Sequence, residues 1–246
     1  MRRAAGVASL PMYLSGQSRG DWAALWSLAR DALRAMEIDA PEALGEPDDL
    51  SAHWRAPDLL LSQTCAKPYR DGLRGRVQLL GAFDFGLEAC PPGYYRSALV
   101  ARAEDRRSLD PLLTSGRIAI NGRDSQSGSV VLQRLDADLR GALVTGAHLR
   151  SIEAVAAGRA DLAAIDANTW RHALRHEAPA RGLRVCGWTK PTPGLPLITA
   201  PGQPADSIRA ALGHAVAAMP GDLAARLGIV GWVALPEALY ADGSAF

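Results

Sequence analysis

The chain has 246 residues, a formal net charge of +1 and 48% hydrophobic residues. This length suits one large domain or two lobes of about 100–150 residues each. Basic and acidic residues are interspersed and nearly balanced, which argues against a nucleic-acid partner, and no stretch approaches the roughly 20 apolar residues of a membrane span. A small molecule or another protein is therefore the expected partner.

The first residues, Met1-Arg2-Arg3, are similar to the charged start of a signal peptide. The apolar stretch behind them is short and runs into Pro11-Met12-Tyr13, so we interpret residues 5–10 as a first strand. The chain as given thus shows no export signal, although an upstream start codon would add one.

The first third of the chain predicts one amphipathic helix and two further strands. The helix begins at Asp21 and ends near Met36, and its apolar residues recur at helical spacing. A polar loop covers 41–49, and apolar runs at 58–62 and 77–81 predict strands. The sequence Cys90-Pro91-Pro92-Gly93 then breaks the chain.

The rest of the chain alternates between predicted strands and helices. A second proline break covers 190–194. The expected strands cover 94–101, 117–120, 141–144, 161–166, 183–188 and 197–200. The expected helices run from the turn after Ile120 to about 135, and over 151–157, 167–176, 206–219 and 223–227.

This alternation predicts an α/β fold with parallel or mixed sheets and helices on both faces. Because the two proline breaks divide the chain, we expect two α/β lobes joined by a two-crossing hinge. Residues 1–90 with 193–246 would form the first lobe and share one sheet, and 91–192 the second. The cleft between such lobes is the default ligand site.

Three cysteines, Cys65, Cys90 and Cys186, form no CxxC pair, so neither a zinc ribbon nor a redox dithiol is expected. Three buried thiols are the expected state. A disulfide between Cys65 and Cys90 is the alternative, because both follow neighbouring strand ends.

The stretch GRDSQSGS, residues 122–129, places hydroxyls and glycines where a strand becomes a helix. Backbone N–H groups at a helix start, with Ser125, Ser127 and Gly128, would suit a tetrahedral oxyanion. The alternative is a helix cap in which Asp124 or Ser125 only starts the helix. The sequence alone leaves both open.

Other strand ends are also polar, and ligands bind outside the carboxyl ends of strands in open α/β sheets. Thr145-Gly146 and His148 follow one strand, and His148 could donate to an anion or lie on the surface. Asp166 could accept from a ligand or cap the next helix. Tyr94 and Tyr95 could line a cleft or pack in the core.

Motifs for other chemistries are missing from the sequence. His172 and His176 have the spacing of a zinc helix, but Ala173 stands where HExxH has Glu. No GxSxG elbow and no GxxxxGK[ST] loop occurs. We therefore expect no catalytic residue, metal or cofactor, and binding rather than catalysis.

The chain resembles the substrate-binding components of phosphate, phosphite and phosphonate ABC importers, which have the type 2 periplasmic binding protein fold. The resemblance is carried by LLLSQTC (59–65), YYRS (94–97), NGRDSQSG (121–128), TGAH (145–148) and SIEAVAAGRADLAAID (151–166). It implies a solute-binding protein that captures a small oxyanion between its lobes and hands it to an ABC permease.

The resemblance also implies which residues bind. The family's Ser-Thr-Ser run corresponds to Ser125, Gln126 and Ser127, with Gln126 in place of Thr. His148, Asp166 and one of the two tyrosines match further site positions. Together with the residues at strand ends, the expected ligand-binding set is Tyr13, Ser62, Gln63, Thr64, Tyr94, Tyr95, Ser125, Gln126, Ser127, Gly128, Thr145, His148 and Asp166.

A second acidic group for a ligand amine is missing, so a smaller ligand is expected rather than an aminoalkyl phosphonate. The resemblance implies a periplasmic location, whereas the chain taken as complete would be cytoplasmic. The alternative functions are an enzyme on the same fold, for example one acting on a pyrimidine or cofactor precursor, and a ligand-sensing domain.

Overall fold

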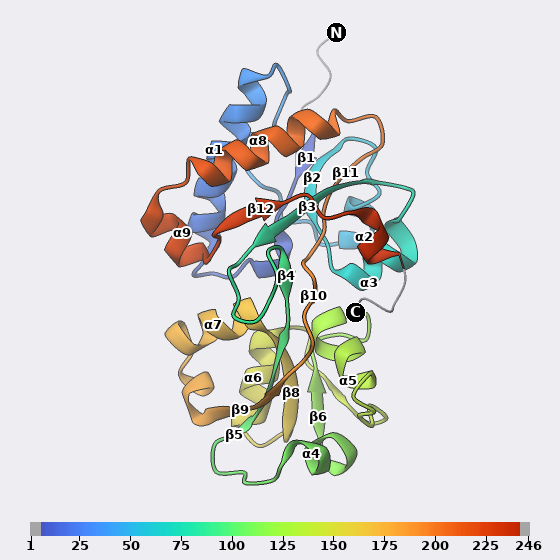
Figure 1. Ribbon diagram of the computed structural model, residues 1–246, viewed down its shortest axis with the longest axis vertical. Helices are drawn as coiled ribbons and strands as arrows, with labels where there is room; N and C mark the ends of the chain where they lie inside the picture. The colour runs from blue at the N-terminus through green and yellow to red at the C-terminus, as the bar shows by residue number, and fades with distance from the viewer. Residues whose placement is uncertain (1–5, 242–246) are drawn as a thin grey trace. The chain divides into compact units, whose positions relative to one another are not determined.

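The chain forms two α/β units in the computed structural model, which describes residues 6–241 (Figure 1). Unit 1 combines the residues up to Glu88 with those from Pro193 onward, and unit 2 is Ala89–Thr192. The chain therefore passes between the units twice, beside the two proline-rich segments.

Unit 1 contains a five-stranded mixed sheet in the order β1-β2-β11-β3-β12. β1 is parallel to β2, whereas β11 runs antiparallel to both β2 and β3, and β12 runs antiparallel to β3. The early and late segments thus share one sheet, as expected. The strands are Val7–Ala8, Leu59–Gln63, Leu197–Thr199, Gln78–Asp84 and Gly231–Val233 in sheet order.

The core of unit 1 forms between this sheet and helices α1 (Arg19–Ala35), α8 (Ala205–Ala217) and α9 (Gly221–Leu227). The helical spacing of Trp22, Leu25, Trp26, Ala29 and Leu33 is confirmed, because all five are buried. The expected helix start at Asp21 is wrong. Ser18 takes the cap position without a side-chain bond, and Asp21 instead pairs with Arg226.

Several short elements interrupt the alternation and were not predicted. They include α2 (Leu50–His53), capped by Asp49, and α3 (Ala66–Pro68), which leads into a π-helical turn at Tyr69–Leu73. Short 3-10 turns lie at Pro11–Tyr13, Ala178–Gly182 and Glu237–Tyr240. Each is too short to show a hydrophobic period.

Unit 2 contains a second mixed sheet in the order β7-β6-β8-β5-β9. β6 is parallel to β7 and β8, and β5 is antiparallel to β8 and β9. In sheet order the strands are Leu143–Val144, Ile118–Ile120, Leu162–Asp166, Ser97–Arg102 and Leu183–Trp188. A separate pair joins β4 (Tyr94–Tyr95) to β10 (Thr192–Pro193).

Both faces of this second sheet are covered. On one face, alternate residues such as Val100 and Ile165 pack against α6 (His148–Ala156) and α7 (Ala167–His176). On the other face, their neighbours pack against α4 (Leu109–Ser115) and α5 (Val131–Gln133). The period of two in a strand buried on both sides explains why these strands are almost entirely apolar.

The three cysteines are thiols rather than disulfide partners, and each is only partly buried. The expectation of fully buried thiols is therefore wrong in degree. His172 and His176 stack with ring centroids 6.3 Å apart, and no cluster of three metal-ligating side chains occurs within residues 6–241. Over the same residues, no helix is both long and apolar enough to cross a membrane.

Candidate functional site

The stretch after β6 does not form the long helix expected from its sequence. Gln126–Val130 form a π-helical turn, in which Val130 N–H donates to Ser125 O at 3.0 Å, and α5 adds only Val131–Gln133. The wider turn buries all five of its residues. Because the helix is short, its dipole is a weak source of positive charge, and the side chains must define the site.

Ser125 caps this turn. Its Oγ accepts a hydrogen bond from Gly128 N–H at 3.1 Å, whereas Asp124 is exposed and does not cap. The helix-cap interpretation is thus confirmed for Ser125. The Ser125 hydroxyl is used as an acceptor here, so its own O–H remains a donor for a ligand.

Ser127 and His148 meet across two segments that are distant in sequence. Ser127 Oγ lies 2.8 Å from Nε2 of His148, the first residue of α6. Ser97 on β5 donates its hydroxyl to the carbonyl of Ser127 at 2.9 Å and fixes the turn. We call Ser125, Ser127, Gly128 and His148 the cradle.

The imidazole of His148 is neutral near pH 7. Burial lowers the pKa of His148 to about 4, and the nearby carbonyl of Ala164 opposes this only in part. The buried Nδ1 atom makes no well-formed hydrogen bond, so the Ala164 contact is a weak one. The cradle therefore offers dipoles rather than a full positive charge.

Asn121, the residue after β6, was not predicted as part of the site. Its Oδ1 occupies the position that a β-carbon on residue 128 would take, and His148 Cε1 lies 3.3 Å from the same position. Asn121 Oδ1 is buried without a hydrogen-bond partner. Gly128 is therefore required by close approach, and the amide of Asn121 belongs to the cradle's wall.

Thr145 holds the loop before α6 together. Its Oγ1 lies 3.1 Å from the carbonyls of Ile120 and Ala147 and 2.7 Å from Ser151 Oγ. Gly146 supplies the left-handed backbone of the turn, with φ +87°. Thr145 thus positions His148, and its expected contact with ligand stays a prediction.

Asp166 starts α7 as its cap. Its Oδ1 accepts from the N–H groups of Asn168 and Thr169 at 2.8 and 3.0 Å, so the capping alternative is confirmed. Asn168, which the sequence did not single out, is almost fully buried. Its Oδ1 accepts from Arg171 at 2.7 Å, and its Nδ2 donor lacks a partner within the described chain.

The two tyrosines of β4 differ in exposure. Tyr95 is 2% exposed, whereas Tyr94 is partly accessible. Since successive side chains of a strand point to opposite faces, only one of the two can face a ligand. Tyr94 is the accessible candidate, and its role stays a prediction.

Unit 1 gathers its predicted polar residues differently. Ser62 hydrogen-bonds to Ser9 at 2.8 Å, and Ser9 lies 2.7 Å from His53 Nε2, a cluster that the sequence did not indicate. Burial lowers the pKa of His53, and Asp58 opposes the shift. Ser62 is thus used internally within the unit.

Gln63 and Tyr13 also lie in unit 1, with opposite surroundings. Both amide atoms of Gln63 are buried without a partner among the described residues, a costly arrangement that a ligand could relieve. Tyr13 instead packs on Trp22 and Phe85 within the apolar core. Thr64 is buried, and its Oγ1 contacts the carbonyl of Cys65 at 3.4 Å.

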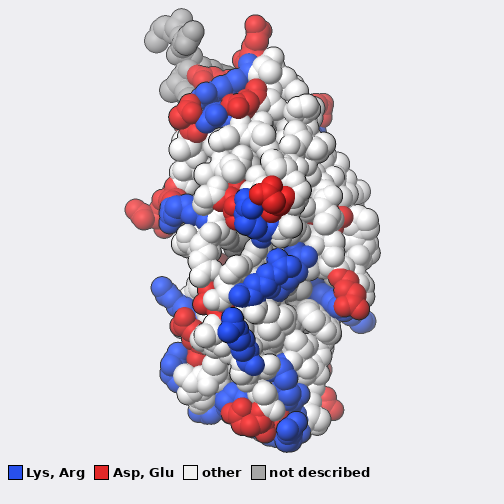
Figure 2. Space-filling view, turned by 90° about the vertical axis from the view of Figure 1, so that its left-hand side faces the viewer, with Lys and Arg blue, Asp and Glu red and all other residues white. Residues whose placement is uncertain are grey.

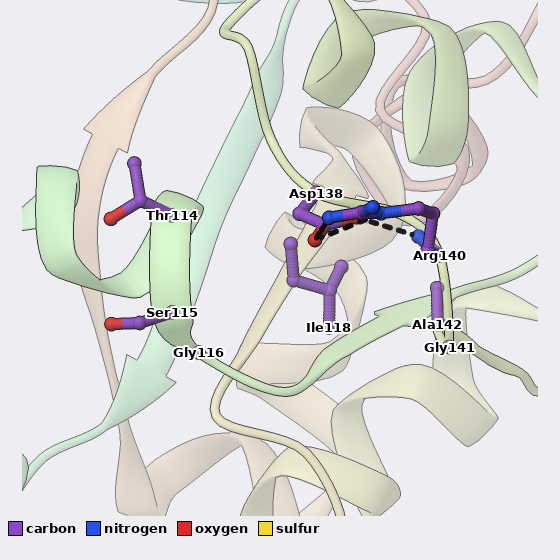
Figure 3. A pocket seen from close by; sticks show the side chains of 8 residues that line it. All are labelled: Thr114, Ser115, Gly116, Ile118, Asp138, Arg140, Gly141 and Ala142. Atoms are coloured by element: carbon purple, nitrogen blue, oxygen red, sulfur yellow. Dashed lines mark hydrogen bonds and ion pairs between the residues drawn. The ribbon is translucent and has the colours of Figure 1, made fainter.

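A polar cavity of about 210 Å³ lies in unit 2, but away from the cradle (Figure 3). It is beside Ile118, the first residue of β6, whereas the cradle follows the last. The hydroxyls of Thr114 and Ser115 donate to backbone carbonyls, and Arg140 is paired with Asp138. The polar groups of this cavity are therefore engaged already.

Charged side chains show no single dominant sign on the surface. Figure 2 shows small groups of Lys or Arg next to Asp or Glu on the face in view, in agreement with the near-zero net charge. This distribution argues for recognition by local contacts rather than by a strong field.

Comparison with known proteins gives one family match. A family model described as "ABC transporter, phosphonate, periplasmic substrate-binding protein" matches residues 66–240. No curated protein matches the sequence.

Solved structures match over nearly the whole chain. PhnD1 from Prochlorococcus marinus in complex with methylphosphonate has a TM-score of 0.73 at 12% identity, covering 95% of this chain and 94% of its own. A binding protein component of an ABC phosphonate transporter from Pseudomonas aeruginosa has a TM-score of 0.73 at 16% identity, covering 97% and 84%. A Xanthomonas citri protein bound to chloride has a TM-score of 0.70 at 17% identity, covering 97% of both chains.

Proposed function

The chain belongs to the phosphonate ABC transporter family of periplasmic substrate-binding proteins, and from this premise we propose that it captures a small oxyanion of the phosphonate, phosphate or phosphite class for an ABC importer. Its fold is the type 2 periplasmic binding protein fold, as the sequence resemblance implied. The proposal extends to a periplasmic location and an ABC permease as partner.

The observation that carries the proposal is the pairing of Ser127 with His148, 2.8 Å apart, beside the capping hydroxyl of Ser125. Hydroxyls, an imidazole and a glycine-lined turn converge there from β6 and α6. Such neutral groups suit an anion that is held by several directed hydrogen bonds. Gln126, fully buried inside the turn, supports its shape.

Further residues are proposed as secondary contacts. Asn168 and Gln63 each carry a buried amide donor without a partner, in unit 2 and unit 1 respectively. Tyr94 is the accessible tyrosine. We assign Asp166 and Thr145 to positioning the loops, because their polar atoms are used in the contacts described above.

A thermal-shift screen tests the proposal, with phosphate, phosphite, methylphosphonate, aminoethylphosphonate, sulfate and taurine as probes. A ligand at 100 times its Kd should stabilise the protein by about 2.7 kcal/mol, a shift of several degrees. Ser127→Ala should abolish most of the shift. The matched control is Ser115→Ala, whose exposed hydroxyl contacts only Pro111 O.

A shift with one phosphorus oxyanion that Ser127→Ala removes and Ser115→Ala keeps would support the proposal. The absence of a shift with every probe would contradict it. An equal shift in both variants would place the binding site elsewhere.

A further inference from the structure

The donors and acceptors of the cradle define the protonation state of the ligand. Ser127 has one hydroxyl hydrogen, and His148 has one ring hydrogen while neutral. The arrangement of these two hydrogens decides whether Ser127 presents a donor or an acceptor to an oxyanion.

The first step concerns the tautomer of His148. Its Nδ1 is shielded from water, and the Ala164 carbonyl acts on the ring as a hydrogen-bond acceptor. A lone pair on Nδ1 would face the lone pairs of this carbonyl, so the hydrogen belongs on Nδ1. Nε2 then carries the lone pair that faces Ser127 at 2.8 Å.

The second step follows for Ser127. Because Nε2 accepts, the Ser127 hydroxyl hydrogen points to His148, and only lone pairs of Ser127 Oγ remain for a ligand. A fully ionised oxygen placed against these lone pairs would be repelled, whereas an acidic hydroxyl group would donate to them. Asn121 Oδ1, buried against Gly128, adds a second partial negative charge nearby.

No charged group compensates this pattern. The causes of the His148 shift include no charged residue. α6 packs against β5, β6, β8, α7 and the 178–182 turn. Of the ionisable groups on these elements, Arg102 is tied to Asp161 and Asp166 caps α7. The others on these elements and on α6 are Arg150, Glu153, Arg171, His172, Arg175, His176 and Arg181.

We propose that the cradle selects oxyanions in a singly protonated form, with a P–OH group of the ligand donating to Ser127 Oγ. This inference rests on the proposed function and narrows its ligand class. Phosphonate, phosphate and phosphite keep such a hydroxyl on part of their molecules at neutral pH, since a phosphate group loses its second proton near about pH 6. Sulfate and sulfonates do not, so they are excluded.

Calorimetric titration of the whole chain with methylphosphonate and methanesulfonate, from pH 6 to 9, tests the proposal. The two probes match in shape and differ in the proton. We expect methanesulfonate to bind about 100-fold more weakly or less, because it lacks the hydroxyl that the site must pair. We expect the Kd of methylphosphonate to rise about tenfold per pH unit above its second pKa, as the competent form is depleted.

His148→Gln provides a second reading, because a Gln amide can donate to Ser127 and release its hydrogen toward the ligand. This variant should narrow the ratio between the two probes, whereas His176→Gln, on the exposed end of α7, should leave it unchanged. Circular dichroism checks that both variants fold.

Equal affinity for the two probes would overturn the inference and leave oxyanion binding intact. An affinity for both probes that rises equally at low pH would also overturn it, because His148 would then carry the proton. The failure of every oxyanion in the thermal-shift screen would instead remove the proposed function, and this inference with it.

Discussion

Asn121 and Gly128 are packed so closely that Oδ1 of Asn121 occupies the space of a β-carbon on residue 128. The two residues lie on either side of the turn that carries Ser125 and Ser127. Gly128 has an ordinary backbone conformation, so its requirement is one of space and not of dihedral angles. The shape of the cradle therefore depends on a missing side chain.

Gly128→Ala should displace the Asn121 amide and shift the turn. We expect a loss of about 1–3 kcal/mol of stability, the usual cost of overpacking, together with most of the ligand-induced thermal shift. Gly213→Ala is the matched control, since its β-carbon would meet open space within α8. That control should be neutral or stabilising by up to about 1 kcal/mol. An unchanged ligand response in Gly128→Ala would separate the turn from the binding site.

Asp166 allows its two sequence interpretations to be separated by experiment. Asn can cap a helix as well as Asp, so Asp166→Asn should change the melting temperature little, whereas Asp166→Ala should cost about 1 kcal/mol. If Asp166 only caps α7, Asp166→Asn should alter the affinities for methylphosphonate and aminoethylphosphonate by the same factor. A selective loss of aminoethylphosphonate would show that the carboxylate reads a ligand amine.

The sequence predicts the alternating elements well because their signals are local. Strands such as Leu59–Gln63 and Leu162–Asp166 are buried on both faces, so they are continuous apolar runs between turn residues. The π-helical turn at Gln126–Val130 was missed, because its apolar continuation looks the same as the start of an α-helix.

The site was predicted in part, for a related reason. Ser127 and His148 each follow a strand end, a position that marks them in the sequence. The roles of Asn121 and of the Ala164 carbonyl depend on contacts between β6, β8 and α6 that no local pattern encodes. Tyr13 shows the converse, because a polar tip at a strand end hid a ring that packs in the core.

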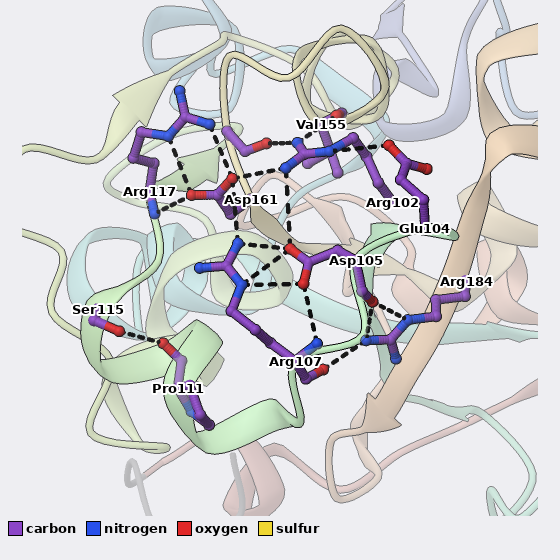
Figure 4. A network of polar contacts seen from close by, with 11 residues as sticks. Arg102, Glu104, Asp105, Arg107, Pro111, Ser115, Arg117, Val155, Asp161 and Arg184 are labelled. Carbon is purple, nitrogen blue, oxygen red and sulfur yellow. Dashed lines mark hydrogen bonds and ion pairs between the residues drawn. The ribbon is translucent and has the colours of Figure 1, made fainter.

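Asp161 holds together the end of unit 2 where β5, β6 and β8 meet (Figure 4). Its carboxylate accepts from Arg102 at 2.9 Å and from the side chain and backbone of Arg117 at 2.9–3.1 Å. These partners hold the pKa of Asp161 far below its usual value. The carboxylate is therefore charged at every pH at which the protein is used.

Asp161→Asn should lower stability by about 2–4 kcal/mol, because it leaves partly buried arginines without their acceptor. Asp138→Asn is the control: its pair with Arg140 is exposed on the surface, so its loss should cost at most about 1 kcal/mol. Urea unfolding measures both. Equal effects in the two variants would show that the Asp161 network contributes no more than a surface pair.

His148 should make the stability of the ligand-free protein depend on pH in the mildly acidic range. Its pKa is lowered from 6.5 to about 4 by burial, so the unfolded chain binds a proton there before the folded chain does. The contribution is fully present above pH 6.5 and is lost as the pH falls toward 4, by an amount on the order of 1–3 kcal/mol.

Thermal unfolding of the wild type and of His148→Gln at pH 4.5 and 7.5 measures this contribution. His53, whose pKa is also lowered, titrates in the same direction, so only the difference between the two proteins reports on His148. The variant should lose less stability than the wild type between these pH values. An identical loss in both would mean that His148 is already solvated, and that the cradle is open to water without ligand.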